Sequence, residues 1–170
     1  LVEVAPDEAT FMPDMEAFEA AVTPKTKAVI VNNPNNPSGV VYSEATIKKI
    51  ASIMDKKQKE YGTEIYLIAD EPYRELVYDG VTVPFLTKYY DNTIVGYSFS
   101  KSLSLPGERI GYLVIPDEVV DAGMLQSAAG VATRILGFVN APTLMQRAVA
   151  RCLDAEVNVE AYDRNRRALY

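Results

Sequence analysis

The sequence predicts an α/β fold in which a mostly parallel sheet is flanked by helices. Short runs of β-branched residues alternate along the chain with longer stretches of helical periodicity, a pattern typical of strand–helix–strand units. The composition is that of a globular domain, with 48% hydrophobic and 24% charged residues among 170. Because no repeat, low-complexity tract or linker interrupts the pattern, we expect residues 1–170 to form a single domain.

The first half of the chain is predicted to contain two helices and two strands. Residues 14–22 have helical spacing with an acidic first turn, and residues 27–32 form a β-branched run that ends in a turn-rich segment. Ser43 has the side chain of a helix N-cap, and residues 46–58 follow it as a helix. Residues 64–70 are the second strand. The residues predicted to form the buried face of the second helix are Ile47, Ile50, Ile53 and Met54.

The second half repeats the alternation. Residues 93–98 and 111–115 are predicted strands, and Pro116 bounds the second of them. Residues 117–129 and 141–154 are predicted helices from their apolar periodicity.

The composition disfavours several classes of function. Without histidine the chain cannot build a Ser-His-Asp or Cys-His system, and with Cys152 as its one cysteine it has no CxxC pair, so we expect no metal site. Its net charge is −6, from 17 Lys and Arg against 23 Asp and Glu, which disfavours a nucleic-acid partner.

The sequence also bears on location and completeness. No apolar run reaches the ~18 residues of a membrane span and no signal peptide opens the chain, so we expect a cytoplasmic protein without a membrane partner. The start at Leu1 and the end at Tyr170, inside a charged helix-like stretch, indicate a piece of a longer protein.

Polar side chains follow three predicted strands at the points where those strands end. They are Asn32, Asn33, Asn35 and Asn36 after the first strand, Asp70, Glu71 and Tyr73 after the second, and Ser98, Ser100 and Lys101 after the third. Ligands of open α/β sheets bind outside the carboxyl ends of the strands. If the three strands are neighbours, these side chains together favour a small, anionic, partly aromatic ligand.

Each of these features also has a structural interpretation. A cluster of Asn, Pro and Gly after a strand is usually turn chemistry, a carboxylate there can cap the next helix, and a single lysine is usually solvated. A nucleotide site is disfavoured because no GxGxxG occurs and because Val95 and Ser100 stand where a phosphate-binding loop ending at Lys101 needs glycine.

Three segments resemble the class I/II aminotransferases, which are pyridoxal 5'-phosphate (PLP) enzymes of the aspartate-aminotransferase fold type. They are TPKTKAVIVNNPNNPSGVVYS, LIADEPYRELVYDG and SFSKSLSLPGERIGY. The third carries the family's lysine signature, in which a Gly or Ser lies three residues before the lysine and an arginine lies eight after it. Ser98, Lys101 and Arg109 fit those positions, and Ile110 and Gly111 fit the apolar and small positions that follow the arginine.

The resemblance implies a catalytic role for three residues. Lys101 would carry PLP as a Schiff base and then act as the base that moves the substrate's α-proton. Asp70 would pair with the pyridine nitrogen and keep it protonated. Tyr73, together with Asn36, would hydrogen-bond the phenolic oxygen of the ring.

The resemblance also implies how the rest of the cofactor is held. Ser98 and Arg109 would bind the phosphate, with a contribution from Ser100. The Asn36–Pro37 peptide bond is predicted to be cis, as is common in the family. Asn140 resembles an Asn-Pro segment of the family near the subunit interface, although Ala141 intervenes before the proline here.

The implied activity is transfer of an amino group from an amino acid to a 2-oxo acid, with the full-length protein a homodimer. The family's glycine-containing phosphate loop, its ring-stacking aromatic residue and the arginine that binds the substrate carboxylate lie outside this segment. We therefore expect the segment alone to be inactive and leave the amino-acid substrate unassigned. Two alternatives remain open: a PLP-dependent carbon–sulfur β-lyase, and a non-catalytic PLP-sensing domain of a regulator.

Overall fold

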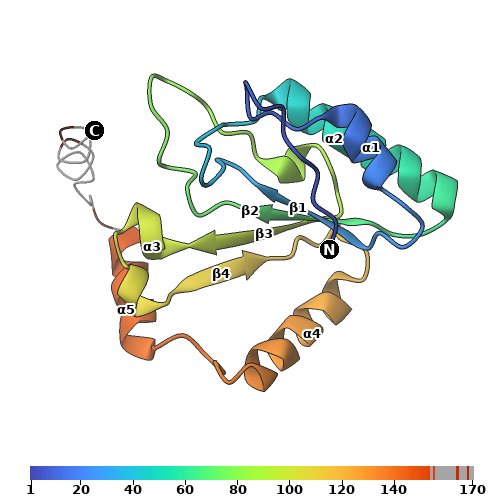
Figure 1. Ribbon diagram of the computed structural model, residues 1–170. Helices are drawn as coiled ribbons and strands as arrows, with labels where there is room; N and C mark the ends of the chain where they lie inside the picture. The colour runs from blue at the N-terminus through green and yellow to red at the C-terminus, as the bar shows by residue number, and fades with distance from the viewer. Residues whose placement is uncertain (154, 156–163, 165–167, 169–170) are drawn as a thin grey trace.

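Four strands form one sheet at the centre of the computed structural model, which describes residues 1–153, 155, 164 and 168 (Figure 1). Their order is β1 (Ala28–Asn32), β2 (Tyr66–Asp70), β3 (Thr93–Ser98) and β4 (Gly111–Val114). The first three are parallel, as predicted, and β4 is antiparallel to β3. The antiparallel pairing suits the short connection over residues 99–110, because a parallel partner would need a crossover back along the sheet.

Side-chain caps define where the first two helices begin. The Asp14 carboxylate accepts hydrogen bonds from two backbone N–H groups of α1 (Met15–Ala21), and the Ser43 hydroxyl accepts one from α2 (Glu44–Tyr61). The second helix ends at Gly62, whose φ of 62° is a left-handed conformation that glycine adopts without strain. The predicted helices over residues 14–22 and 46–58 are therefore confirmed, the second being longer than expected.

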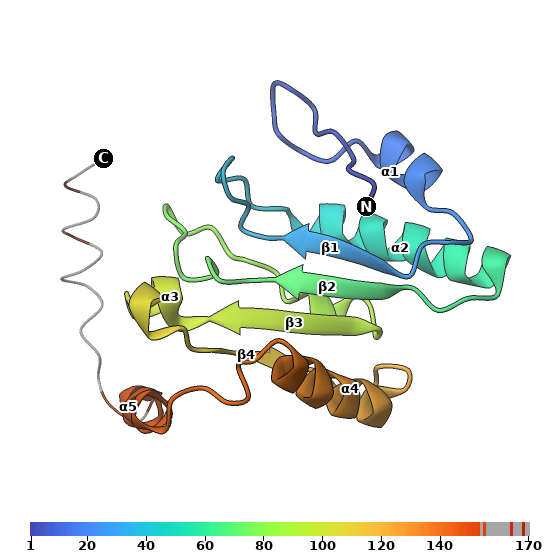
Figure 2. The ribbon, with the colours of Figure 1, turned by 60° about the horizontal axis from the view of Figure 1, so that its bottom comes forward.

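The core lies between α2 and one face of the sheet. Ile47, Ile50, Ile53 and Met54 of α2 are buried, as predicted, against Val31, Leu67 and Ala69 of β1 and β2. Figure 2 shows α2 running along these strands. Complete burial of one such side chain contributes about 1.5–3 kcal/mol, so this layer fixes the sheet against the helix.

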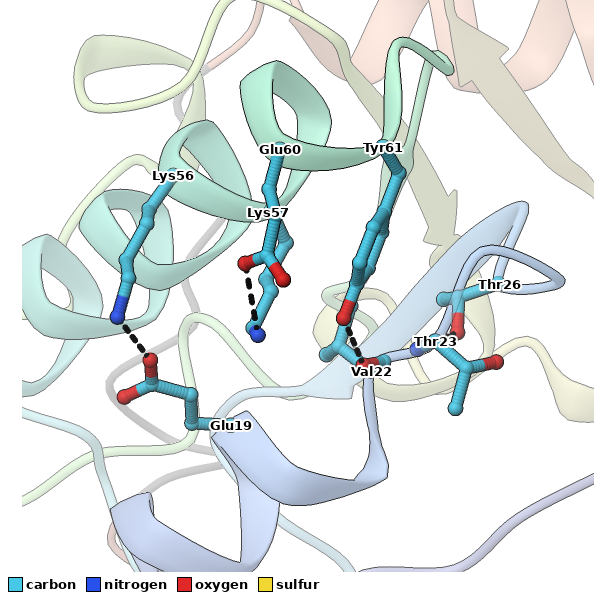
Figure 3. Close-up of polar contacts among 8 residues, drawn as sticks. All are labelled: Glu19, Val22, Thr23, Thr26, Lys56, Lys57, Glu60 and Tyr61. Atoms are coloured by element: carbon cyan, nitrogen blue, oxygen red, sulfur yellow. Dashed lines mark hydrogen bonds and ion pairs between the residues drawn. The ribbon is translucent and has the colours of Figure 1, made fainter.

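Polar contacts join α1 to α2 on the outer side of this layer (Figure 3). The Lys56 ammonium pairs with the Glu19 carboxylate, and the Tyr61 hydroxyl donates a 3.1 Å hydrogen bond to the carbonyl of Val22.

The opposite face of the sheet is open where it carries Ile30, whose side chain is 63% exposed. Ile30, Ile68 and Ile94 are register partners and form one row on that face. Two residues further along the strands, the next row is Asn32, Asp70, Gly96 and Leu113. Because strand side chains alternate between faces, this polar row points away from α2.

The C-terminal helices differ in part from the prediction. The helix predicted over residues 117–129 is α4 (Ala122–Ile135), because residues 116–121 form turns and Asp121 has a φ of 58°. The other predicted helix is α5 (Thr143–Leu153), and Asp154 lies outside the described residues. No helix in the described part of the chain is long and apolar enough to span a membrane.

Short helical turns complete the structure. The end of β3 continues directly into α3 (Phe99–Ser102). One 3-10 turn, Leu86–Lys88, precedes β3, and another, Pro106–Glu108, follows α3. Phe99 of α3, Ile110 and Val149 of α5 form a second small core beside the end of β3.

Candidate active site

The carboxyl ends of β1, β2 and β3 meet at one edge of the sheet. Asn32 is the register partner of Asp70, and Asp70 is the register partner of Gly96, two residues before Ser98. The three strands are thus neighbours, and the polar residues that follow them lie on adjoining loops, as the sequence predicted.

Asn32 links the first two strand ends. Its Nδ2 donates to the Asp70 carboxylate Oδ2 at 3.0 Å and to the Asp70 carbonyl at 3.1 Å. Its Oδ1 accepts the backbone N–H of Asn36 at 2.7 Å. Sequence reasoning placed Asn32 among the strand-end asparagines but gave it no role. Its position in the sequence could have indicated a role, because Asn32 and Asp70 each end a strand and point to the same face of the sheet.

A second set of contacts joins Asn36 to the lysine. Asn36 Nδ2 donates a 2.8 Å hydrogen bond to the Tyr73 hydroxyl oxygen. The Lys101 ammonium lies 5.5 Å from the centre of the Tyr73 ring, within the range of a cation–π contact. The structure therefore brings four predicted site residues into one continuous series, which are Asp70, Asn36, Tyr73 and Lys101. Asn32 joins Asp70 to Asn36.

The turn after β1 gives Asn36 its position. The Asn36–Pro37 bond is cis, as predicted, and Asn33–Pro34 is cis as well. Asn35 Oδ1 accepts the Ser38 hydroxyl at 2.7 Å, and the buried Asn33 Oδ1 accepts the backbone N–H of Tyr42 at 2.8 Å. Two of the four asparagines thus hold the turn, which leaves Asn32 and Asn36 to face the strand ends.

The residues predicted to bind phosphate are only partly brought together. Ser98 caps α3, accepting the backbone N–H of Ser100 at 3.1 Å, and its hydroxyl donates to the Ser100 hydroxyl at 2.7 Å. Arg109 is exposed, has a φ of 52° and donates from Nη1 to the carbonyl of Pro106 at 2.9 Å. Its backbone lies near Ser98, since the neighbouring Ile110 carbonyl accepts the N–H of Phe99 at 3.1 Å.

Several hydrogen-bonding groups at this edge have no partner among the described residues. The Asp70 Oδ1 accepts nothing there, and the Lys101 ammonium makes no ion pair there. The Tyr73 hydroxyl accepts from Asn36, so its own hydrogen is free to be donated. Partial burial raises the pKa of the Asp70 carboxyl, and the hydrogen bond from Asn32 opposes that rise.

A clamp that the sequence did not reveal fixes the loop after Asp70. Arg74 Nε donates to the buried Glu71 carboxylate at 2.8 Å, and its Nη1 and Nη2 donate to the carbonyls of Val83 and Pro84 at 2.8 and 2.9 Å. The guanidinium also lies 3.7 Å from the centre of the Phe85 ring. One arginine therefore holds both ends of the loop that carries Tyr73.

Two cavities lie away from this edge. One of about 740 Å³ is lined by α2 together with Lys88 and Tyr89, and one of about 290 Å³ lies near Asn92. Neither is lined by a predicted site residue. We assign the site from the convergence of side chains at the carboxyl ends of the strands.

No group of three or more Cys, Asp or Glu in the described part of the chain is arranged to hold a metal ion.

The sheet is mostly parallel, and an amide, a carboxylate, a phenol and a lysine lie at its strand ends, which is the edge at which open α/β sheets bind their ligands. The sequence matches the family described as aminotransferase class I and II over residues 1–170. It is 32% identical to the aspartate/prephenate aminotransferase of Thermus thermophilus, over 97% of this chain and 41% of that protein. It is also 32% identical to aromatic-amino-acid aminotransferase 2 of Thermococcus litoralis, over 95% of this chain and 39% of that protein. The chain belongs to the class I and II aminotransferases.

Solved structures agree with this assignment. An amino transferase from Eubacterium rectale is 56% identical and superimposes with a TM-score of 0.91, covering 100% of this chain and 43% of that one. The aromatic aminotransferase of Pyrococcus horikoshii is 26% identical with a TM-score of 0.78, covering 99% of this chain and 44% of that one. The chain thus spans about two fifths of the length of these relatives. Its fold is that of a fragment of a fold type I, PLP-dependent transferase.

Proposed function

We propose that the whole protein is a PLP-dependent aminotransferase, which transfers an amino group from an amino acid to a 2-oxo acid. In this proposal residues 1–170 are one domain, the PLP-binding large-domain segment of that enzyme. The family match and the named relatives support the class of reaction. A homodimer and a cytoplasmic location belong to the same proposal and rest on the resemblance and on the sequence alone.

The free hydrogen-bonding groups are the observation that carries the proposal. Asp70 has a carboxylate oxygen free to accept a hydrogen bond. At a separate position, Tyr73 has a free O–H donor and Asn36 has a second amide N–H donor. PLP has a ring nitrogen that can be protonated and an anionic ring oxygen. It therefore suits one acceptor and two donors that already share a rigid edge, and the residues present fit the cofactor.

Each residue then has a role that its own chemistry supports. When bound, PLP supplies the electron sink for the negative charge left at the substrate's α-carbon. The Asp70 carboxylate holds a proton on the ring nitrogen. Lys101 Nζ, as the neutral amine, would take the proton from the substrate's α-carbon, hold it as the ammonium, and give it to the cofactor carbon that bears the amino nitrogen. Tyr73 would donate its hydroxyl hydrogen to the ring oxygen of PLP and so help to orient the ring.

We assign the cofactor phosphate to Ser98, Ser100 and Arg109. The two hydroxyls lie 2.7 Å apart and can both donate to one anion once their mutual bond opens. Arg109 would exchange the Pro106 carbonyl for the phosphate, which is a stronger acceptor for a guanidinium. Nothing in the comparisons favours the carbon–sulfur lyase or the regulator alternative.

A single turnover of the full-length protein tests the proposed reaction. Mixing the PLP-loaded protein with an excess of one amino acid should release one 2-oxo acid per active site and leave the cofactor in its amine form. Release of pyruvate and ammonia with the cofactor still in its aldehyde form would instead identify a lyase. Neither product, with every common amino acid tried, would overturn the proposal.

A further inference from the structure

We propose that Asn32 is a positioning residue of the active site, which locks the Asp70 carboxylate and the Asn36 backbone into one arrangement. The inference rests on the proposed function, because it concerns the two residues that would hold opposite parts of the cofactor ring. It assigns a role to a residue that the lysine signature and the Asp-Glu-Pro-Tyr segment do not contain.

The hydrogen bonds of Asn32 determine how its side-chain amide is turned. Asp70 Oδ2 and the Asp70 carbonyl are both acceptors, so the –NH₂ group must face them, at 3.0 and 3.1 Å. The Asn36 backbone N–H is a donor, so the amide oxygen must face it, at 2.7 Å. A flipped amide would place donor against donor and acceptor against acceptor. The Asn32 amide therefore has one orientation, and its hydrogen bonds fix the positions of the Asp70 carboxylate and the Asn36 backbone.

Position in the sheet makes this link rigid. Asn32 ends β1 and is the register partner of Asp70, so its backbone is held by the parallel ladder. Asn36 follows four residues later, and its side-chain amide donates a hydrogen bond to the Tyr73 hydroxyl. A displacement of the Asn32 amide would thus move the Asp70 carboxylate and the Asn36–Tyr73 pair together. Neither contact can be adjusted separately.

The same bond acts on the charge of Asp70. Partial burial raises the pKa of this carboxyl, and the Asn32 N–H is the group that opposes the rise. A carboxylate that must hold a proton on a ring nitrogen has to be ionised itself. The Asn32 amide favours that ionised form in the absence of any ligand, which gives a readout independent of activity.

Two substitutions separate the contacts of Asn32 to Asp70 from its contact to Asn36. Asn32→Ala removes all three side-chain hydrogen bonds. Asn32→Asp is similar in size, retains an acceptor for the Asn36 N–H and removes both donations to Asp70. Asn92 offers a matched control at the other end of the sheet, roughly 13 Å along β3 from Gly96, the register partner of Asp70. Its Nδ2 donates to the Glu64 carboxylate at 2.9 Å and its Oδ1 accepts the Val120 N–H at 2.8 Å, which is the same kind of bridge.

The experiment measures the Asp70 pKa by carbon-13 NMR in the full-length, cofactor-free protein, with the signal assigned from Asp70→Asn. The dissociation constant for PLP is measured on the same variants. We expect Asn32→Ala to raise the Asp70 pKa by about one unit, the usual effect of one hydrogen bond to a charged group, and to weaken PLP binding roughly tenfold. Asn32→Asp should raise the pKa further through charge repulsion, and Asn92→Ala should lower stability and leave the Asp70 pKa unchanged.

The outcomes separate this inference from the proposed function. An Asp70 pKa and a PLP affinity that stay at their wild-type values in Asn32→Asp, while Asp70→Asn reduces turnover, would overturn the role of Asn32 alone. Full turnover in Asp70→Asn would overturn the proposed function instead. If Asn32→Ala does not fold, the same criteria apply to Asn32→Asp, which preserves the size of the side chain and its contact with the Asn36 N–H.

Discussion

Two effects oppose each other at the exposed Asp70 carboxyl: partial desolvation at the sheet edge raises its pKa, and the hydrogen bond from the Asn32 amide lowers it. Burial is the larger, so the pKa of Asp70 is raised above its reference value of 3.8. A raised pKa in the folded protein means that this group stabilises the fold when protonated. That contribution is present below the unfolded-state pKa and is lost as the pH rises through the folded-state pKa.

Asp70→Asn removes this loss, because an amide does not ionise. In the cofactor-free full-length protein, the free energy of unfolding of the variant should therefore gain on that of the wild type as the pH is raised from about 3 to 7. Urea unfolding at a series of pH values measures the difference. A difference that is constant across the series, or that moves toward the wild type, would contradict the raised pKa.

Tyr73→Phe removes the phenolic oxygen that joins Asn36 to the site. We expect turnover of the full-length enzyme to fall roughly tenfold, which corresponds to one hydrogen bond, with little loss of stability. Tyr66→Phe is the matched control, because Tyr66 starts the strand that leads to Asp70 and its hydroxyl donates at 3.3 Å to the carbonyl of Val120. Equal turnover in the two variants would argue against a role for Tyr73.

Sequence reasoning could name candidate site residues but not the contacts between them. Lys101, Asp70 and Tyr73 stand in motifs that a reader can match, whereas Asn32 and Arg74 acquire their contacts only when the strands are in register and the loop is closed. Hydrogen bonds between residues 38 positions apart, such as that from Asn32 to Asp70, leave no local pattern in the sequence.

At the scale of elements, the loop after β2 depends on Arg74. Arg74→Ala would leave the Glu71 carboxylate, which is 3% exposed, without its cation, and would free the carbonyls of Val83 and Pro84. We expect a loss of about 3 kcal/mol in the free energy of unfolding, typical for breaking a buried pair. Arg74→Lys keeps the charge but loses the planar guanidinium, so its free energy of unfolding should lie between those of the wild type and Arg74→Ala. A loss below about 0.5 kcal/mol in Arg74→Ala would show that the clamp is not needed.

The pairing of β3 with β4 depends on Gly111. A Cβ at Gly111 would lie 2.3 Å from the carbonyl oxygen of Tyr97, next to Ser98, so the two strands would have to separate. Gly111→Ala should cost about 1–3 kcal/mol in the free energy of unfolding. Gly130→Ala, in the middle of α4 with nothing within 4 Å of its added carbon, should instead stabilise by about 0.5–1 kcal/mol. Thermal unfolding of both variants compares the two, and equal effects would contradict the close approach.

The elements that the sequence predicted well carry local signals. Asp14 and Ser43 cap their helices with side chains, and β3 has the predicted bounds of residues 93–98. The start of α4 was predicted too early because residues 117–121 have helical composition, while the Pro116 carbonyl accepts the Val119 N–H and closes a turn there. The antiparallel direction of β4 follows from tertiary pairing, for which strand periodicity gives no sign.

For the whole molecule, the face of the sheet that bears the site differs from the face that bears the core. Ile30 and Leu113 are 63% and 58% exposed, on rows that include or adjoin Asn32 and Asp70. Apolar surface of this kind is typical of a contact surface. The alternation of β-branched and helical stretches predicted the class of fold but could not indicate which face of the sheet would be covered. The inactivity expected of the 170-residue segment alone stays a prediction.

The account depends on Lys101 being the residue that holds the cofactor. Borohydride reduction of the PLP-loaded full-length protein, followed by peptide mapping with mass spectrometry, tests this directly. The cofactor should be found covalently attached to Lys101, and the attachment should be absent from Lys101→Ala and from Lys101→Arg, which retains the positive charge. Attachment to a different lysine, or the same yield of labelled protein in Lys101→Ala, would contradict the site proposed at the ends of β1, β2 and β3.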